Sequence, residues 1–177
     1  MNPTTFPIER GAMADLRARL AARADELTLL DVAYRTIDSP VGPLLLAATE
    51  TGLVRVAFES EGFDTVLDSL ATRVSPRVLQ APRRLDTAAA ELHEYFAGTR
   101  RAFDLPLDLA LSSGFRQVVQ RYLPHIGYGH TQTYTEVAET VGNPRAVRAV
   151  GLRAADGVDH LAAGLVLDLT EDRVAVV

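Results

Sequence analysis

Arginine side chains that follow a tight turn are the residues whose type and spacing could do chemistry in this chain. Arg145 and Arg148 come directly after Gly142, Asn143 and Pro144 and are three positions apart, so they share one face of a helix that starts there. A guanidinium offers a planar fork of N–H donors that matches phosphate oxygens and can stack on flat rings. The pattern predicts a surface that contacts a nucleic acid.

Two short helices and the turn between them must position these arginines. The apolar residues of 134–141 recur at helical spacing, which predicts the first helix. Gly142 suits the left-handed position that follows a helix end. Asn143 is expected to cap the second helix, and Pro144 suits its first position, where no N–H is needed. This order is typical of a helix-turn-helix motif.

Several polar residues lie near the expected starts of helices, where backbone N–H groups also point outward. We predict that they contact phosphates, although each could equally be an ordinary exposed polar residue. This predicted set is Arg145, Asn143, Thr133, Thr135 and Arg116.

The residues of this region resemble those of the methylated-DNA–protein-cysteine methyltransferases, which are the O6-alkylguanine DNA repair proteins. The resemblance rests on NPRAVRAVG at 143–151, and it extends back through YTEVA at 134–138, IGYG at 126–129 and SGFR at 113–116. It covers roughly residues 33–153. It implies an α+β fold, double-stranded DNA as partner, O6-alkylguanine as the lesion, and another repair protein as a further partner.

The resemblance also implies roles for two residues. Arg148 matches the arginine that enters the duplex and fills the gap left by a flipped-out nucleotide, which offsets a few kcal/mol of unstacking. Tyr134 matches the tyrosine that crowds the phosphate beside the target. The alternatives are a solvated arginine on an exposed helix face and a core or capping aromatic residue.

The family's reaction centre has no counterpart in this chain. A Pro-Cys-His-Arg-Val run is expected about a dozen residues beyond the second helix, but residues 154–168 contain no Cys, and neither does the rest of the chain. The family reaction is thiolate attack on the alkyl carbon, so it requires a thiol. The family's hinge Asn falls at about Gly157, and His160 does not match the family's His. We therefore expect no catalytic residue, no alkyl transfer and an incomplete lesion pocket.

Composition narrows the remaining choices. The 177 residues carry a net charge of −5, and all 18 basic residues are Arg. Residues 114–153 hold five Arg against two Glu, which makes this window locally basic on an acidic protein. Four His and no Cys favour neither a metal site nor a cofactor. We find no secretory or membrane-spanning segment, so we expect a cytoplasmic protein that does not contact membranes. We expect it to be a monomer.

Periodicity predicts an α+β chain in three parts. Residues 1–30 form an extension with an amphipathic helix at about 12–29. Residues 31–110 form an amino-terminal α+β domain with an antiparallel sheet. Residues 111–177 form a winged-helix-like helix-turn-helix domain with a divergent tail. The expected strands are 32–37, 44–49, 53–58 and 103–109, with a short strand or loop at 79–82. The expected helices are 63–70, 85–96 and one capped by Ser112 or Ser113. The tail 165–177 is expected to be a β-hairpin, or one buried strand with a frayed end.

Two rivals to a DNA-binding function follow from the same sequence. The first is that the chain is a degenerate remnant without DNA function, shortened or frame-shifted at its end. The loss of resemblance after Gly151 is what such a remnant would show. The second is that the chain is a protein-interaction module that uses the helix between Met13 and Leu27 to bind a partner. The alternative for this helix is that it packs on its own domain.

Overall fold

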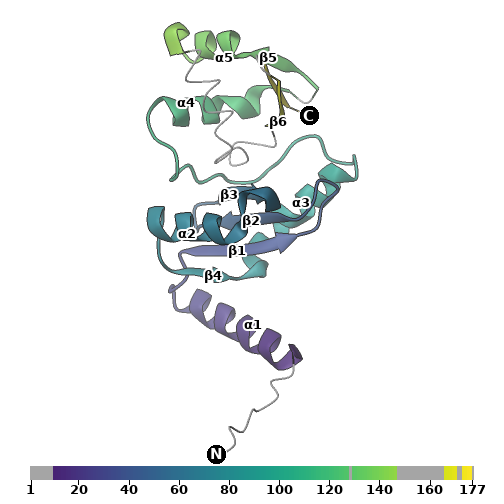
Figure 1. Ribbon diagram of the computed structural model, residues 1–177, viewed down its shortest axis with the longest axis vertical. Coiled ribbons are helices and arrows are strands. Elements are labelled where there is room, and N and C mark those ends of the chain that lie inside the picture. Colours follow the sequence, from purple (N-terminus) through teal and green to yellow (C-terminus); the bar gives the residue numbers. More distant parts are fainter. Residues whose placement is uncertain (1–9, 128, 147–165, 171–172, 177) are drawn as a thin grey trace, which may run out of the picture.

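The computed structural model describes residues 10–127, 129–146, 166–170 and 173–176. Figure 1 shows three parts along the long axis of the molecule: the helix α1 (Arg10–Glu26), a layered unit around a sheet, and a carboxyl-terminal unit of short helices and strands. Helices and strands alternate irregularly in this order, which confirms the α+β class. In the described part of the chain, no helix is long and apolar enough to cross a membrane.

The central sheet has four strands in the order β3-β2-β1-β4. β1 (Val32–Ile37), β2 (Leu44–Ala48) and β3 (Leu53–Phe58) form an antiparallel meander, as their alternation predicts. β4 (Val78–Gln80) pairs with β1 in parallel, with Val32 opposite Val78. This parallel edge was not predicted, because it depends on the path of α2 (Phe63–Arg73) over the sheet and not on a local turn.

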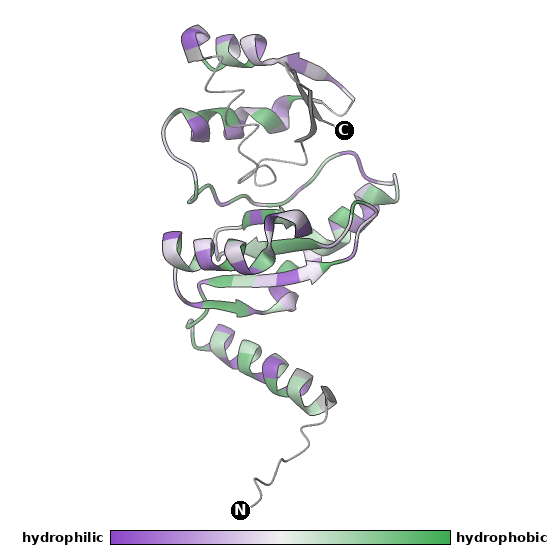
Figure 2. Cartoon of the chain, viewed as in Figure 1, coloured by the Kyte–Doolittle hydropathy of each residue, from purple (hydrophilic) through white to green (hydrophobic). Residues whose placement is uncertain are grey.

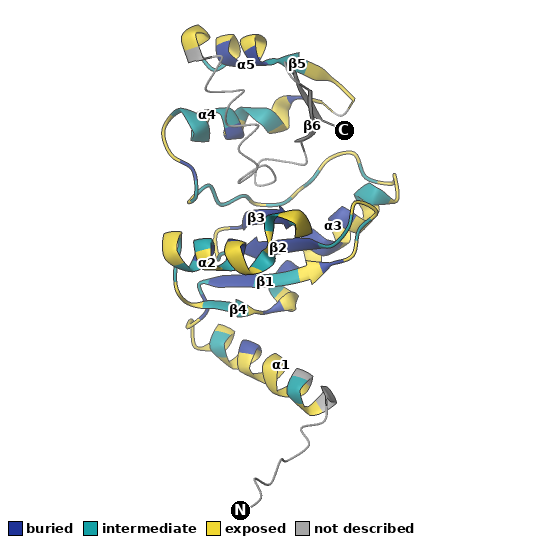
Figure 3. Ribbon diagram, in the orientation of Figure 1, coloured by how far each residue is buried: buried dark blue, intermediate teal, exposed yellow. Residues whose placement is uncertain are grey.

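Two helices cover the two faces of this sheet. α2 buries Val66 and Leu70 on one face, and α3 (Asp86–Phe96) buries Ala88 and Leu92 on the other. Every residue of β2 is buried, because its alternate side chains enter the two cores in turn. Figures 2 and 3 show the result as a strand that is both apolar and buried in the middle of the unit.

The segment after α3 departs from the predicted strand. Residues 103–109 form one isolated β-bridge, between Leu107 and Leu53, and do not form a β-ladder of several residue pairs. The strand prediction is therefore wrong. Pro106 has no N–H to donate, which limits pairing on this segment. Its carbonyl oxygen accepts the N–H of Leu53 at 2.8 Å, and the N–H of Asp108 donates to the oxygen of Leu53 at 2.9 Å. The segment is therefore fastened to the start of β3.

Gly52 makes this attachment possible. A Cβ at this position would lie 2.2 Å from the carbonyl oxygen of Pro106, which is backbone and cannot swing away. We expect Gly52→Ala to lower the free energy of unfolding by about 2–4 kcal/mol, measured by urea denaturation. Gly42→Ala is the control: it also has a positive φ, 99°, but meets nothing within 4 Å, so it should cost about 1 kcal/mol. Equal losses in the two variants would contradict the close approach.

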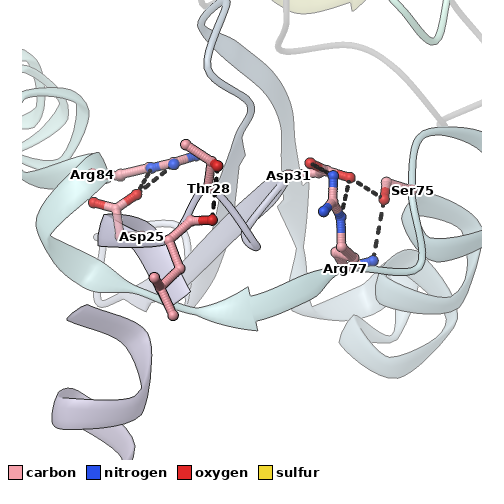
Figure 4. Close-up of polar contacts among 7 residues, drawn as sticks. Asp25, Thr28, Asp31, Ser75, Arg77 and Arg84 are labelled. Carbon is pink, nitrogen blue, oxygen red and sulfur yellow. Dashed lines mark hydrogen bonds and ion pairs between the residues drawn. The ribbon is translucent and has the colours of Figure 1, made fainter. Parts of the chain in front are cut away.

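Ion pairs fasten the edges of the sheet, and two of them appear in Figure 4. Asp31, just before β1, accepts hydrogen bonds from the guanidinium of Arg77 at 2.6 and 2.8 Å and from the hydroxyl of Ser75. The hydrogen bonds from Arg77 and Ser75 lower the pKa of the Asp31 carboxyl. On β3 the buried Arg55 pairs with Glu61, and burial lowers the pKa of its guanidinium.

The lowered pKa of Asp31 predicts a dependence of stability on pH. A carboxyl whose pKa is lower in the folded state stabilises the fold above its ordinary pKa of 3.8, and this contribution disappears as the pH falls through the lowered value. We expect Asp31→Asn to be less stable than the parent at neutral pH and equal to it in strong acid, measured by thermal melts across pH. Asp68→Asn, on the exposed side of α2, is the control and should follow the parent at every pH.

Helix α1 joins this unit through its last turns. Ala21 is buried, Ala24 packs against the same core, and Asp25 pairs with Arg84 on the segment before α3 (Figure 4). The helix ends at Glu26, three residues before the expected end, and Thr28 takes a positive φ of 53°. The leucines of α1 lie elsewhere on the helix and remain exposed.

Candidate nucleic-acid interface

The start of helix α5 (Tyr134–Thr140) is fixed by a reciprocal pair of side chains. The hydroxyl of Thr133 accepts the backbone N–H of Glu136 at 3.1 Å, and the carboxylate of Glu136 accepts the backbone N–H of Thr133 at 2.6 Å. This capping box satisfies two donors that a helix start would otherwise leave without partners. Thr133 therefore has a structural role, in addition to the phosphate contact predicted for it.

The end of α5 is fixed by two backbone hydrogen bonds. The N–H of Asn143 donates to the oxygen of Ala138 at 2.8 Å, and the N–H of Gly142 donates to the oxygen of Glu139 at 3.0 Å. These two bonds form a Schellman motif, and Gly142 has the positive φ of 80° that the motif requires. The prediction for Gly142 is confirmed. The chain then enters a short 3₁₀ turn, η4 (Pro144–Ala146), at the position predicted for the start of the second helix.

A small core holds α5 against helix α4 (Phe115–Tyr122). Val137 and Ala138 are fully buried with Ile126, and apolar residues of α4 pack against them. Val118 was expected on the same face but is 47% exposed. The predicted cap of α4 by Ser112 or Ser113 is also wrong, because the cap residue is Gly114, with a φ of 59° and no side-chain bond. The apolar residues of α4 and its continuation that do pack here are Phe115, Val119, Tyr122 and Leu123.

The predicted phosphate contacts are distributed unevenly over this unit. Asn143 and Arg145 are both exposed at the turn that follows α5, and Thr135 is exposed on the first turn of α5. Thr133 is half-buried in the capping box, and Arg116 is half-buried on α4. The structure therefore exposes Asn143 and Arg145 at the same turn. Arg148 lies outside the described residues, so its predicted role stays a prediction.

Tyr134 is the predicted site residue that the structure places in the core. Only 9% of it is exposed, and it packs with Ile126 and Val137 at the start of α5. Burial of this kind fits the alternative of a core aromatic residue. Its predicted role beside a phosphate stays untested.

The tail of the chain adds strands that sequence reasoning only half anticipated. β6 (Val166–Thr170) and β7 (Arg173–Val176) form the predicted hairpin. β7 also pairs with β5 (Thr131–Thr133), which gives a three-stranded sheet in the order β5-β7-β6. β5 was missed because three residues carry too little periodicity to predict a strand. Since β5 leads directly into α5, the hairpin adjoins the helix-turn-helix as a wing does.

Metal ligands do not gather in the described parts of the chain: no group of three or more His, Asp or Glu there could hold an ion. Tyr122 and His125 stack with ring centroids 6.0 Å apart, and the ring nitrogen Nδ1 of His125 lies 3.0 Å from the carbonyl oxygen of Tyr122. These contacts bind the loop after α4 to the helix.

The capping box makes a prediction for stability. Thr133→Ala removes the cap of α5 and should lower the free energy of unfolding by about 1 kcal/mol, measured by urea denaturation. Thr135→Ala, two residues along and exposed, should change stability by less than about 0.5 kcal/mol. If Thr133→Ala proved as harmless as Thr135→Ala, the cap would not stabilise the helix start.

After α1, the fold consists of an α+β unit followed by a helix-turn-helix unit of the DNA-binding kind. Residues 32–109 match the family model of the 6-O-methylguanine DNA methyltransferase ribonuclease-like domain, and residues 114–157 match that of the DNA-binding domain of the same enzyme. The chain belongs to the methylated-DNA–protein-cysteine methyltransferase family, as the resemblance implied.

Relatives and solved structures agree with this assignment. The chain is 37% identical over 121 residues to the methylated-DNA–protein-cysteine methyltransferase of Mycolicibacterium paratuberculosis, covering 68% of each chain. It is 36% identical over 118 residues to the constitutive enzyme of Bacillus subtilis, covering 67% of this chain and 68% of that one. The crystal structure of the Mycobacterium tuberculosis O6-methylguanine methyltransferase is similar with a TM-score of 0.62 and 34% identity, covering 75% and 74% of the two chains. The M. tuberculosis protein has also been solved in complex with DNA, and that structure is similar with a TM-score of 0.61 at the same identity, covering 74% of each chain.

Proposed function

We propose that this chain is a non-catalytic, cytoplasmic DNA-binding protein that recognises O6-alkylguanine in duplex DNA and recruits another repair protein to it. The proposal rests on two features found in the same chain. The start of a helix-turn-helix exposes Asn143 and Arg145 at its turn, and the chain contains no Cys. The first feature supports binding, and the second removes the nucleophile of the family's reaction.

In this proposal the residues divide between positioning and probing. Asn143, Arg145 and Thr135 would contact phosphates and set the register on the duplex, assisted by Thr133 and Arg116. Arg148 would enter the stack and replace a flipped base, with its flat guanidinium against the neighbouring bases. Tyr134 would crowd the adjoining phosphate. Because no thiol is present, a bound alkyl group would stay on the base and the complex would be reversible.

Charge sets how strongly salt opposes this binding. The whole chain carries −5, while residues 114–153 carry five Arg against two Glu. A protein of this charge neutralises few phosphates, and each contributes about −0.9 to the slope of log affinity against log salt. We therefore expect weak affinity at physiological salt and a shallow slope.

Fluorescence anisotropy with two duplexes tests the proposal. The duplexes are identical except for one O6-methylguanine, and each is titrated with the parent chain and with Arg148→Ala. We expect the parent to prefer the lesion and Arg148→Ala to lose that preference, with about tenfold weaker binding to the lesion, because the gap is no longer filled.

Two further variants make the result specific. Arg83→Ala removes an exposed arginine from the amino-terminal unit and should bind both duplexes as the parent does. Arg145→Ala should weaken binding to both duplexes equally and reduce the salt slope by about one. A parent chain that binds neither duplex at low salt would overturn the proposal and favour the degenerate remnant.

The remnant is the weaker candidate, because the tail on which it depends pairs with the rest of the unit. β7 is hydrogen-bonded to β5 over Thr131 to Thr133, directly before the capping box of α5. A carboxyl-terminal segment without a structural role would not be expected to extend a sheet at the start of the DNA-binding motif.

A further inference from the structure

Helix α1 exposes a row of leucines on one of its sides. Leu16 is 59% exposed, Leu20 56% and Leu27 47%. Leu27 comes just after the helix end at Glu26, but its N–H still donates to the carbonyl oxygen of Arg23 at 3.2 Å, so the helical path continues to it. The three leucines are four and seven residues apart and therefore lie in one row. Figure 3 shows the helix as mostly exposed.

The contacts of α1 with its own domain use a different side of the helix. Ala21 is buried, Ala24 packs against the same core, and Nε of Arg84 donates to Oδ1 of Asp25 at 2.8 Å. On a helical wheel Ala21, Ala24 and Asp25 are centred about 110° from the leucine row. The domain therefore holds the helix in place and leaves the leucines exposed.

Arginines lie closer to the leucine row than acidic residues do. On the same wheel, three arginines are within about 80° of the middle of the row: Arg17, Arg19 and Arg23. The acidic residues of the helix are about 100–160° from it: Asp15, Asp25 and Glu26. We call the three leucines and the three arginines together the Leu–Arg face of α1.

The positive charge of the Leu–Arg face is only partly compensated. Glu26 pairs with Arg23 at 3.0 Å, and Asp25 is engaged by Arg84 of the domain. Arg17 and Arg19 are exposed and have no ion-pair partner among the residues that the structure describes. Since the whole chain carries −5, this face is a local patch of positive charge combined with apolar surface.

Charge and spacing together indicate what this surface binds. We propose that the Leu–Arg face docks an acidic, leucine-bearing helix of another protein. Leucines four and seven residues apart have the spacing of a seam that packs against a second helix. Arg17 and Arg19 lie on the two sides of this seam, where residues of a coiled coil choose their partner by charge. Carboxylates beside the leucines of the incoming helix would pair with both arginines.

Other occupants match the Leu–Arg face less well. A second copy of the chain would bring Arg17 and Arg19 against the same positive charges, which is unfavourable. A lipid bilayer would take the leucines into its apolar layer together with Arg23, which is only about 40° from the middle of the row. A duplex would offer phosphates to the arginines but no apolar surface to the leucines. An acidic amphipathic helix satisfies both kinds of side chain.

This inference deepens the proposed recruitment of another repair protein and rests on it for the role of the partner. In Figure 1 α1 lies at one end of the molecule, and α5 with its turn lies at the other. A helix docked on α1 would therefore leave the DNA-binding motif uncovered. The two interactions can be measured separately for this reason.

Fluorescence anisotropy with labelled peptides, in the absence of DNA, tests the proposal on the full-length chain. The first peptide is a synthetic helix about three heptads long with Leu at a and d and Glu at e and g, and the second has Lys in place of Glu. We expect the acidic peptide to bind at least about tenfold more tightly than the basic one, because only carboxylates pair with Arg17 and Arg19.

Variants of exposed residues make the test specific. Leu20→Gln should weaken binding of the acidic peptide about tenfold, because an apolar contact is lost. Arg19→Glu should weaken it as much and should bind the basic peptide more tightly than the parent does. Arg83→Glu makes the same charge change outside α1, and Ala22→Gln changes another side of α1, so both should bind as the parent does.

Several results would overturn the proposal. They are equal binding of the two peptides, binding of neither, or equal losses in Arg19→Glu and Arg83→Glu. Binding to phosphatidylglycerol vesicles, or a dimer in sedimentation velocity, would also overturn it if Leu20→Gln abolished that interaction, because the face would then have a different occupant.

The two duplexes with and without O6-methylguanine separate this inference from the proposed function. Leu20→Gln should prefer the lesion as the parent does, since Leu20 lies at the opposite end of the molecule from α5. A chain that prefers the lesion but binds neither peptide would refute only the docking of an acidic helix. A chain that binds the acidic peptide but neither duplex would refute only the proposed DNA function.

Discussion

The burial of β2 on both faces is the constraint on which the amino-terminal unit depends. A strand with no solvated side requires a covering layer on each face, and α2 and α3 provide them. Because α2 must cross from β3 to the far edge of the sheet, β4 arrives next to β1 and runs parallel to it. The unusual edge of the sheet is thus a consequence of covering its centre.

The connection to the second unit is held against the sheet by a close backbone approach and by side-chain hydrogen bonds. Gly52 allows the carbonyl of Pro106 to approach β3, and Thr49 binds the carboxylate of Asp108 on the same segment. Arg73 of α2 donates to the carbonyl of Leu111 at 2.7 Å. The chain is therefore held against the sheet almost to the start of α4, although it forms no ladder there. A segment fastened at these points gives the helix-turn-helix a defined origin.

The carboxyl-terminal unit fixes the first helix of its DNA-binding motif by local bonds, in a chain that contains no Cys. The capping box at Thr133 and the Schellman motif at Gly142 fix both ends of α5 by local hydrogen bonds. Neither depends on residues 154–168, where the family's cysteine would lie. Local bonds of this kind keep Asn143 and Arg145 exposed at the turn irrespective of the divergent segment. Loss of the thiol and retention of the DNA-binding motif are therefore physically compatible.

The sequence by itself determined the features that rest on local periodicity and turn chemistry. The strands β1 to β3, the helices α2 and α3, the left-handed Gly142 and the tail hairpin follow from neighbouring residues, and so does the absence of a thiol. The family follows from motifs at fixed spacing. Only the tertiary structure decided the parallel pairing of β4, the pairing of β7 with β5, the burial of Tyr134 and the exposure of the α1 leucines. Each of these depends on contacts between residues distant in the chain, which periodicity along the sequence does not encode.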